Sequence, residues 1–433
     1  MNTEKLDSEI TILGAGLSSI YAAYKLSNLD TSIIFGQNEI GGILNGQKWK
    51  NFYIDNGCHL FDGNKEQLDF FENVGGMIEH QVRYGSFNQG KLSNDIATPE
   101  IHSIDLVNSA IEEVQNLECL SNYDYEKYSN IREVFVEKFG DTCGNYLADI
   151  QKKFTGQNSE NIIPSQIEKF SVFNRIRIGN DQISNQLKKT NSYLDKIICS
   201  SLESRGLPRY QRSMYPKKNG TAGFVTEATK FLNKKNIKLV NNFQIRHIKK
   251  VNDTFEIISN DGIKFRSKVV LSTLPYPLLG QLLGYVKGTK PDFISYKIII
   301  LEVNRDHVLD NYYVQDFDSL NTIYRSSNMG FYSNQFSSDG TTYVMAEIPY
   351  HQNFKNIDIN NVKDEMVLHK ILKKGSQIID YKGFDKKNII PINANIHTFE
   401  FPKNLYSINP NAFSMKDKLT NIDEISIDIN EKY

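Results

Sequence analysis

The 433-residue sequence is poor in cysteine, and this bounds the kind of protein it can be. Its four cysteines, Cys58, Cys119, Cys143 and Cys199, include no Cys-x-x-Cys pair. Four cysteines in a chain of this length do not indicate a disulfide scaffold, so we expect a reducing, cytoplasmic setting. His80 and His102 have no partners at metal-ligand spacing, and we assign no metal site.

An excess of either charge and a long apolar run are also absent. The formal net charge is -1, which gives no indication of a nucleic-acid partner or of an acidic membrane surface. Residues 1–7 contain no apolar signal region, and no apolar run reaches transmembrane length. We therefore expect a cytoplasmic protein without an integral membrane segment. No feature indicates an oligomeric state.

The strongest positive signal is a glycine-containing loop near the N-terminus. Residues 10–13 are β-branched and apolar, and residues 20–26 continue with a helical apolar pattern. Gly14 permits a tight turn, Gly16 lets main chain approach a pyrophosphate, and the small Ser19 lets the helix pack near the strand. The loop consists of Gly14, Ala15, Gly16, Leu17, Ser18 and Ser19. This strand–loop–helix context predicts dinucleotide binding, with the phosphates at the helix N-terminus.

The second predicted strand, residues 31–35, departs from the dinucleotide pattern at its end. An Asp or Glu usually stands about twenty residues after the glycines, where it binds the ribose hydroxyls. This chain has Phe35 there, and Glu39 follows four residues later. Dinucleotide binding is therefore predicted with its ribose anchor missing.

Two further segments make the pattern more specific. Gly41-Gly42 directly follows the second strand, and residues 52–61 read as a strand leading to Asp55-Asn56-Gly57-Cys58-His59-Leu60. In this order and spacing the sequence resembles the flavin-dependent superfamily of amine oxidases, protoporphyrinogen oxidases and UDP-galactopyranose mutases. The resemblance implies FAD as cofactor, with Gly41 and Gly42 against its phosphate–ribityl region. It also implies a flavin loop of Gly57, Cys58, His59 and Leu60.

The same resemblance continues along the chain. Residues 215–224, Tyr-Pro-Lys-Lys-Asn-Gly-Thr-Ala-Gly-Phe, are similar to the superfamily's stretch before a helix of the nucleotide domain. The main chain at Ile245 matches the position that holds the adenine in relatives, although a plain strand gives the same pattern. Residues 269–275 resemble the strand and Thr-x-Pro exit from that domain.

Two basic residues are candidates for the catalytic region. Lys297 matches the lysine that holds a water near the flavin in amine oxidases, but an edge-strand lysine at the surface reads the same way. Arg325 lies in a segment where mutases place an arginine that binds the substrate diphosphate. A surface ion pair is an equally good interpretation of Arg325.

The C-terminal part departs from the superfamily a second time. Relatives return to the nucleotide domain with a Gly-Arg segment and a helix N-terminus at the flavin, whereas residues 407–433 contain no glycine. Residues 417–433 are polar and charged, and we expect them to fray.

We therefore predict an α/β protein in which a Rossmann-like FAD/NAD(P)-binding domain carries an inserted α+β substrate domain. The predicted divisions are a first nucleotide-binding segment 1–85, a helical cap 86–204, a second nucleotide-binding segment 205–290, a sheet-rich substrate region 291–385 and a C-terminal return segment 386–433. The favoured function is an FAD-dependent oxidoreductase that moves a hydride from a small molecule to flavin. The alternatives are a mutase-like sugar-nucleotide isomerase that uses reduced flavin, and a degenerate member that binds flavin weakly or not at all.

Overall fold

The structure is a computed structural model that describes residues 6–57, 60–117, 125–169, 171–201, 203–206, 211–285, 292–350, 357–392, 399–410, 412 and 414–433. It divides into two compact units, and each is built from separated stretches of chain. Unit 1 comprises residues 1–79, 214–290 and 395–433, and unit 2 comprises residues 80–213 and 291–394. The fold class predicted from the sequence, a mixed α/β protein with a largely parallel sheet, is confirmed.

Unit 1 is built on a twisted sheet whose strand order is β11-β2-β1-β14-β13-β12, with β20 also paired to β14. The strands β11, β2, β1, β14 and β20 run parallel, and β12, β13 and β14 form an antiparallel meander. Their bounds are β1 Ser8–Leu13, β2 Thr31–Ile34, β11 Lys238–Val240, β12 Ile245–Val251, β13 Thr254–Ser259, β14 Lys264–Ser272 and β20 Leu405–Ser407. The other elements of this unit are α1 Leu17–Lys25, the short helix η1 Gly42–Leu44, β3 Gln47–Trp49, β4 Phe52–Ile54, α2 Lys65–Gly75, α8 Gly220–Lys234, α9 Tyr276–Leu282 and α12 Met415–Lys432.

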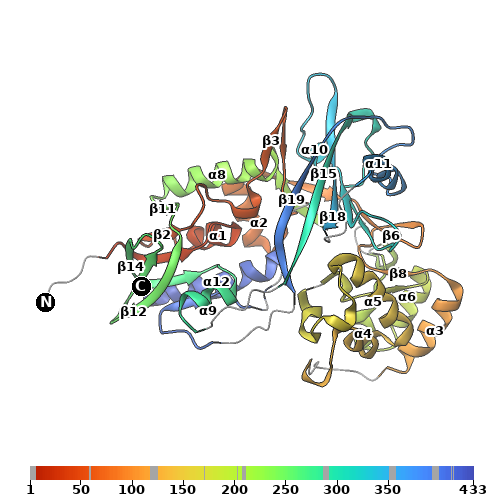
Figure 1. Ribbon diagram of the computed structural model, residues 1–433, viewed down its shortest axis with the longest axis horizontal. Coiled ribbons are helices and arrows are strands. Elements are labelled where there is room, and N and C mark those ends of the chain that lie inside the picture. The colour runs from red at the N-terminus through yellow and green to blue at the C-terminus, as the bar shows by residue number, and fades with distance from the viewer. Residues whose placement is uncertain are drawn as a thin grey trace. The chain divides into compact units, whose positions relative to one another are not determined.

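Alternation along the strands divides the unit 1 core between the two faces of the sheet. Ile33, Val269 and Leu271 lie in one apolar cluster with residues of α1, α2, α8 and α12, whereas Ile34 and Val270 lie in another with residues of α9. A strand with both faces covered must be apolar at nearly every position, as these are. The red α1 contacts both the green α8 and the blue α12, so distant stretches of chain meet here (Figure 1).

Unit 2 contains a mixed sheet and a group of helices. The sheet has the order β19-β15-β18-β17-β16-β6-β7, and its pairs are antiparallel except for β16 with β6. The strands are β6 Tyr84–Asn88, β7 Lys91–Asn94, β15 Asp292–Asn304, β16 Tyr313–Asp316, β17 Arg325–Ser327, β18 Thr341–Tyr350 and β19 Ile378–Ile392. The helices are α3 Ile104–Gln115, α4 Ile131–Phe139, α5 Asp141–Thr155, α6 Asp181–Lys188, α7 Ser192–Ile197, α10 Met329–Tyr332 and α11 Ile359–Leu368. Strands β8 Glu100–Ile101 and β9 Arg177–Ile178 pair with each other. Strands β5 Met77–Val82 and β10 Gln211–Pro216, each of which belongs partly to unit 1, also pair.

The structure corrects the expected divisions of the chain. The first change between units lies at residues 79/80, six residues before the expected 85/86. The second lies at residues 213/214, nine residues after the expected 204/205. The expected division at 385/386 falls inside β19, which continues to Ile392. Strand β19 crosses this point because its pairing with β15 runs from Ile378 to Ile392, with a shift of register near each end.

The expectation that residues 417–433 fray is wrong, because they lie in helix α12. Ser414 caps this helix in a reciprocal capping box with Asp417. Leu419, Ile422 and Ile429 are fully buried, so the helix has an apolar stripe despite its polar composition. The prediction of fraying was based on the polar composition of this segment. It did not use the helical spacing of its apolar side chains.

We expect Ile422→Ala to lower the free energy of unfolding by about 2–5 kcal/mol, because a fully buried isoleucine of α12 would leave a cavity. Ile427 lies on the same helix with 57% of its surface exposed, so Ile427→Ala is the matched control and should change stability by less than about 1 kcal/mol. Chemical denaturation measures both. Equal small effects in the two variants would show that α12 does not pack on unit 1.

Candidate functional site

The glycine loop between β1 and α1 has the conformation that its sequence predicts. Gly14 has φ +126°, and a Cβ there would overlap the hydroxyl of Thr273. Gly16 has an ordinary φ of -83°, but an added Cβ would find no atom within 4 Å. The two glycines therefore serve different ends: Gly14 is required by the fold, whereas Gly16 leaves open space above the main chain.

That open space faces the N-terminus of α1. The amides of Leu17 and Ser18 donate no hydrogen bond to any described residue, and the first turn of α1 has no acidic side chain. Ser19 is buried, and its hydroxyl lies 2.7 Å from Thr273 Oγ1, which ties the helix to the end of β14. Free amides and a positive helix end favour an anionic group.

The loop after β2 lies directly against the glycine loop. The amide of Gly41 donates to the carbonyl of Ala15 at 2.6 Å. Gly42 has φ +57°, and a Cβ on it would come within 3.3 Å of Gly16 Cα. The two glycine segments singled out from the sequence are thus neighbours, and main chain lines the space beside Gly16 on both sides.

The end of β2 explains the missing ribose carboxylate in physical terms. Phe35 follows β2 with 4% of its surface exposed, and it belongs to the apolar cluster under α1 and α8. A glutamate at this position would bury a charge in that cluster, so Phe35→Glu is not the simple gain of a ligand. The nearest downstream carboxylate, Glu39, is exposed on the following loop.

The other residues expected to contact a flavin are those of the segment 57–60 and Ile245. Gly57 has φ +135°, and Leu60 is partly buried, whereas Cys58 and His59 lie outside the described residues. Ile245 begins β12, pairs with Ser259 of β13, and packs against the apolar cluster near α9. Their contacts with a cofactor stay predictions.

Asp55, at the start of the segment 55–60, is a buried carboxylate that joins separated parts of unit 1. Asp55 follows β4 with 1% of its surface exposed, and its oxygens accept from the amide of Thr221 at 2.8 Å and the hydroxyl of Thr221 at 3.0 Å. The hydroxyl of the fully buried Tyr215 also donates to it. Thr221 is in the first turn of α8, so Asp55 anchors that helix. Burial raises the pKa of Asp55 to about 6, and the hydrogen bonds from Tyr215 and Thr221 only partly oppose this.

The two basic candidates lie in unit 2, and both are paired across strands. Arg325 of β17 donates to both carboxylate oxygens of Glu347 on β18, at 2.7 and 2.8 Å. Lys297 Nζ lies 3.7 Å from the carboxylate of Asp385 on β19. Strand β15, which carries Lys297, lies between β19 and β18, so the interpretation of Lys297 as an edge-strand lysine is wrong. The assigned roles of both residues stay predictions.

Unit 2 also contains a buried polar cluster that the sequence did not reveal. Asp316 binds Lys153 Nζ at 3.0 Å and His369 Nε2 at 2.8 Å, and His369 Nδ1 lies 2.8 Å from Ser326 Oγ. Burial lowers the pKa of Lys153, whereas for Asp316 the charges of Lys153 and His369 outweigh burial and lower its pKa. The side chain of Lys153 is only 7% exposed, and nothing in its local sequence indicates this burial. The members of this cluster come from α5, β16, β17 and the end of α11, so no local stretch of sequence indicates it.

Ser326, His369 and Asp316 have the residue types of a hydrolase triad, but the arrangement differs. The serine faces Nδ1 and the aspartate faces Nε2, and all three side chains are inaccessible to solvent. A nucleophile needs a substrate within reach. The cluster therefore fixes β16 and β17 in place.

The fold was compared with those of known proteins. No protein-family model matches the sequence, and no curated protein matches it. A structure of reduced UDP-galactopyranose mutase is 14% identical, with 99% of this chain and 95% of that chain covered and a TM-score of 0.70. Putrescine oxidase with bound putrescine is 10% identical, with 98% and 99% covered and a TM-score of 0.61. A protein from Exiguobacterium sp. 255-15 assigned as a protoporphyrinogen oxidase is 12% identical, with 99% and 100% covered and a TM-score of 0.63.

This chain has their fold. The resemblance inferred from the glycine motifs is confirmed at that level, over nearly the full length of both partners. Among the described residues there is no group of three or more side chains arranged to hold a metal ion. No described helix combines the length and the apolar character needed to cross a membrane.

We expect the stability of the protein to fall as pH rises from about 4 to about 6, because of Asp55. The unfolded carboxyl releases its proton near the ordinary value of 3.8, whereas the folded one keeps it to about 6, so folding binds a proton in this range. The difference corresponds to about 3 kcal/mol. Urea unfolding at a series of pH values measures this contribution.

The contribution of Asp55 is isolated by Asp55→Asn, which should flatten this part of the pH profile. Its control is Asp253→Asn, at an exposed aspartate in the turn between β12 and β13, which should keep the profile of the parent protein. An unchanged slope in Asp55→Asn would contradict the assignment.

Proposed function

We propose that this protein is a flavin-dependent enzyme that binds FAD in unit 1 and moves a hydride from a small-molecule substrate to the flavin. The observation that carries the proposal is the open space at Gly16, with the free amides of Leu17 and Ser18 on one side and the Gly41–Gly42 main chain on the other. A pyrophosphate fits such a site because it needs donors and close approach rather than a countercharge. FAD-dependent relatives of this fold support the same assignment.

Each residue near this space has a defined task in the proposal. Gly14 and Ser19 hold the loop against Thr273, and the amides of residues 16–18 bind the pyrophosphate. Gly41 and Gly42 allow the ribityl chain to lie on main chain, and residues 57–60 reach the ring. Asp55 keeps α8 in register with that loop through Thr221. The bound flavin supplies the redox chemistry, and the protein supplies orientation and electrostatics.

Two features lead us to expect weak FAD binding. A charged hydrogen bond to the ribose is worth about 1.5–3 kcal/mol, and Phe35 cannot make one. The N-terminus of α12 is already occupied by its own capping box, with Asp417 in the first turn, so it offers an anion neither free amides nor favourable charge. These features also keep open the third candidate, a protein with this fold that binds little or no flavin.

A sugar-nucleotide isomerase is the second candidate function. The TM-score of 0.70 with reduced UDP-galactopyranose mutase and the presence of Arg325 favour it. In this protein the guanidinium is held by Glu347, so a diphosphate would have to displace a carboxylate from a bidentate pair. This function would require reduced flavin, whereas the oxidoreductase would reduce flavin during its own turnover.

We expect the purified protein to carry less than one FAD per chain, and Gly16→Val to abolish the remaining binding by filling the space beside the loop. The substitution should leave the protein folded, because no atom lies within 4 Å of a Cβ at this position and φ is -83°. Absorbance between about 350 and 500 nm and titration with FAD measure the binding, and thermal unfolding measures the fold. Parental FAD affinity in folded Gly16→Val would sink the proposed site.

The isomerase reading makes a separate prediction about Arg325. If UDP-sugars bind there, Arg325→Ala should weaken their binding by about 2–4 kcal/mol, whereas Glu347→Gln should tighten it by removing the competing charge. Arg132→Ala is the control, because Arg132 forms an exposed ion pair with Glu160 in the same unit. Equilibrium binding of UDP-galactose to the flavin-reduced protein measures all four proteins. If Arg325→Ala binds UDP-galactose as tightly as the parent, or if the parent does not bind it, the oxidoreductase proposal is favoured over the isomerase.

A further inference from the structure

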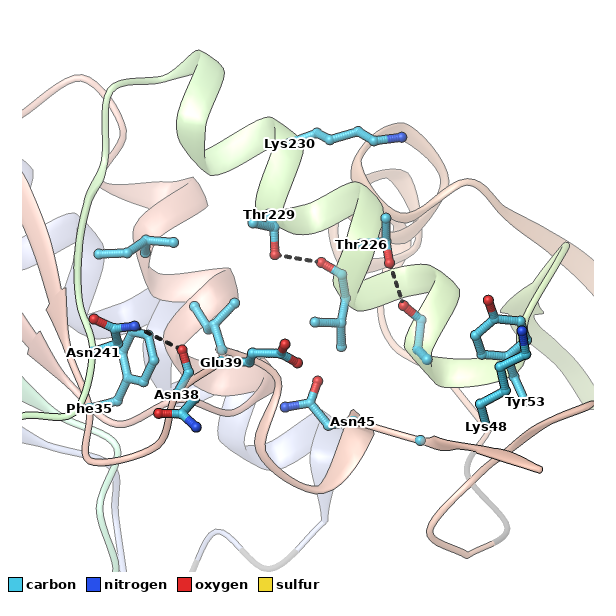
Figure 2. Close-up of a pocket in the computed structure, with 15 residues that line it drawn as sticks. Phe35, Asn38, Glu39, Asn45, Lys48, Tyr53, Thr226, Thr229, Lys230 and Asn241 are labelled. Carbon is cyan, nitrogen blue, oxygen red and sulfur yellow. Dashed lines mark hydrogen bonds between the residues drawn. The ribbon is translucent and has the colours of Figure 1, made fainter.

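Unit 1 contains a cavity of about 660 Å³ between the loop after β2 and helix α8 (Figure 2). Phe35 and Glu39 are among the residues that line it. An adenosine joined to a pyrophosphate at Gly16 would lie at this end of β2. The cavity therefore belongs to the proposed dinucleotide site, and the feature that goes beyond this site lies in unit 2.

Strand β19 forms one edge of the unit 2 sheet. It pairs with β15 on one side and with no other strand in the part of the chain that the structure describes (Figure 1). Its pairing with β15 is regular over residues 380–386, which we call the edge segment, and the register shifts on either side of it. Within the whole chain, 55% of the Tyr381 surface is exposed, and Gly383 and Asp385 are exposed as well. An exposed sheet edge is a template for pairing with another strand.

The main chain of the edge segment shows which groups are available for such pairing. The amide of Tyr381 donates to Asp380 Oδ1 at 2.8 Å and not to β15. Along an antiparallel strand, the N–H and C=O groups of successive residues point to alternate sides. The main-chain groups of Gly383 and Asp385 therefore point away from β15, as those of Tyr381 do. These three residues can each form hydrogen bonds with a neighbouring strand.

The side chains of the edge segment are self-complementary about Gly383. If a second copy of this strand pairs antiparallel across a two-fold axis at Gly383, Asp380 lies opposite Lys386 of the second copy. In the same arrangement Lys382 lies opposite Phe384 of the second copy. These residues share one face of the strand, because side chains alternate between faces. Lys386 Nζ lies 5.8 Å from the centre of the Phe384 ring, so this face already holds an ammonium group near that ring.

Other positions of the two-fold axis fit less well. An axis at Lys382 or at Phe384 would bring lysines directly opposite one another, which is destabilising. An axis at Tyr381 or at Asp385 would leave most of the edge segment unpaired. An axis at Gly383 pairs the whole regular segment and places opposite charges together at both of its ends. Strand geometry and charge therefore select the same register.

We propose that the edge segment is a dimerisation surface, on which β19 of a second copy of this chain pairs antiparallel about Gly383. Each pair of outward-facing residues exchanges two main-chain hydrogen bonds, which gives about six in total. This number lies within the range of specific protein–protein interfaces. Two ion pairs between Asp380 and Lys386, one on each side of the axis, set the register. The proposal goes beyond the flavin-dependent function and does not depend on it.

Sedimentation velocity of the full chain, at concentrations up to about 100 µM, tests the proposal. We expect a monomer–dimer equilibrium in the parent protein. Asp380→Lys and Lys386→Asp should each weaken the dimer by about tenfold or more, because each turns two attractive cross-strand pairs into repulsive ones. The double variant restores opposite charges and should dimerise as the parent does. A folding defect in either single variant would not be repaired in this way.

Cysteine cross-linking tests the register. Gly383→Cys should form a disulfide between two copies on oxidation, because the Cα atoms of such a pair lie about 5.5 Å apart. The added Cβ would lie 3.1 Å from Ile299 Cδ1, a terminal methyl group that can move. Tyr381→Cys should not cross-link, because its own copy lies further along the ladder. Glu112→Cys, on an exposed position of α3, is the control for random collisions, and the oxidised parent is the control for the native cysteines.

Three outcomes would overturn the proposal. The first is a parent protein that stays monomeric up to about 100 µM, which would leave the edge segment open to a peptide of another protein. The second is a dimer that neither charge variant weakens, or that the double variant does not restore, because another surface would then hold it. The third is cross-linking of Tyr381→Cys without cross-linking of Gly383→Cys, because the two-fold axis would then lie elsewhere.

Discussion

The carboxylate of Asp55 is the constraint on which the arrangement of unit 1 depends. It comes from the first stretch of the chain, and its hydrogen-bond partners Tyr215 and Thr221 come from the second, after the whole of the inserted residues 80–213. Gly220 must be a glycine beside it, because φ is +55° and a Cβ would overlap the carboxylate. The position of α8 follows from this contact.

Burying that carboxylate has an energetic cost that the unit offsets with local hydrogen bonds. An unpaired charge in this place would be prohibitive, whereas two donors from Thr221 and one from Tyr215 satisfy most of its acceptor positions. Unit 2 uses the same solution in its Asp316 cluster, with Lys153 and His369 as partners. In both units a buried acid joins segments that lie far apart in the sequence.

The parts of the structure that could be predicted from sequence are those whose physical requirements are local. The turn at Gly14 needs a positive φ, and the close approach of a ligand to Gly16 needs the absence of a side chain. Both requirements can be recognised from neighbouring residues in the sequence. The pairing of Arg325 with Glu347 and the burial of Lys153 depend on which strands become neighbours, and no local pattern carries that information. Helix α12 was predicted to fray for a different reason: its buried apolar stripe is narrow, and its many charges lie on the solvent side.

Strand β14 has a consequence for the order in which the chain assembles. Its first half pairs with β13, its second half pairs with β20, and its other edge pairs with β1. These partners span residues 8 to 407, so the central strand of unit 1 cannot complete its hydrogen bonds until almost the whole chain has been synthesised. The sheet of unit 2 has the same property, because β6 pairs with β16 and β15 pairs with β19, which joins residues 84 to 392. Long loops must close before such contacts form, so both sheets are expected to form late in folding, and their strand edges stay exposed to aggregation until then.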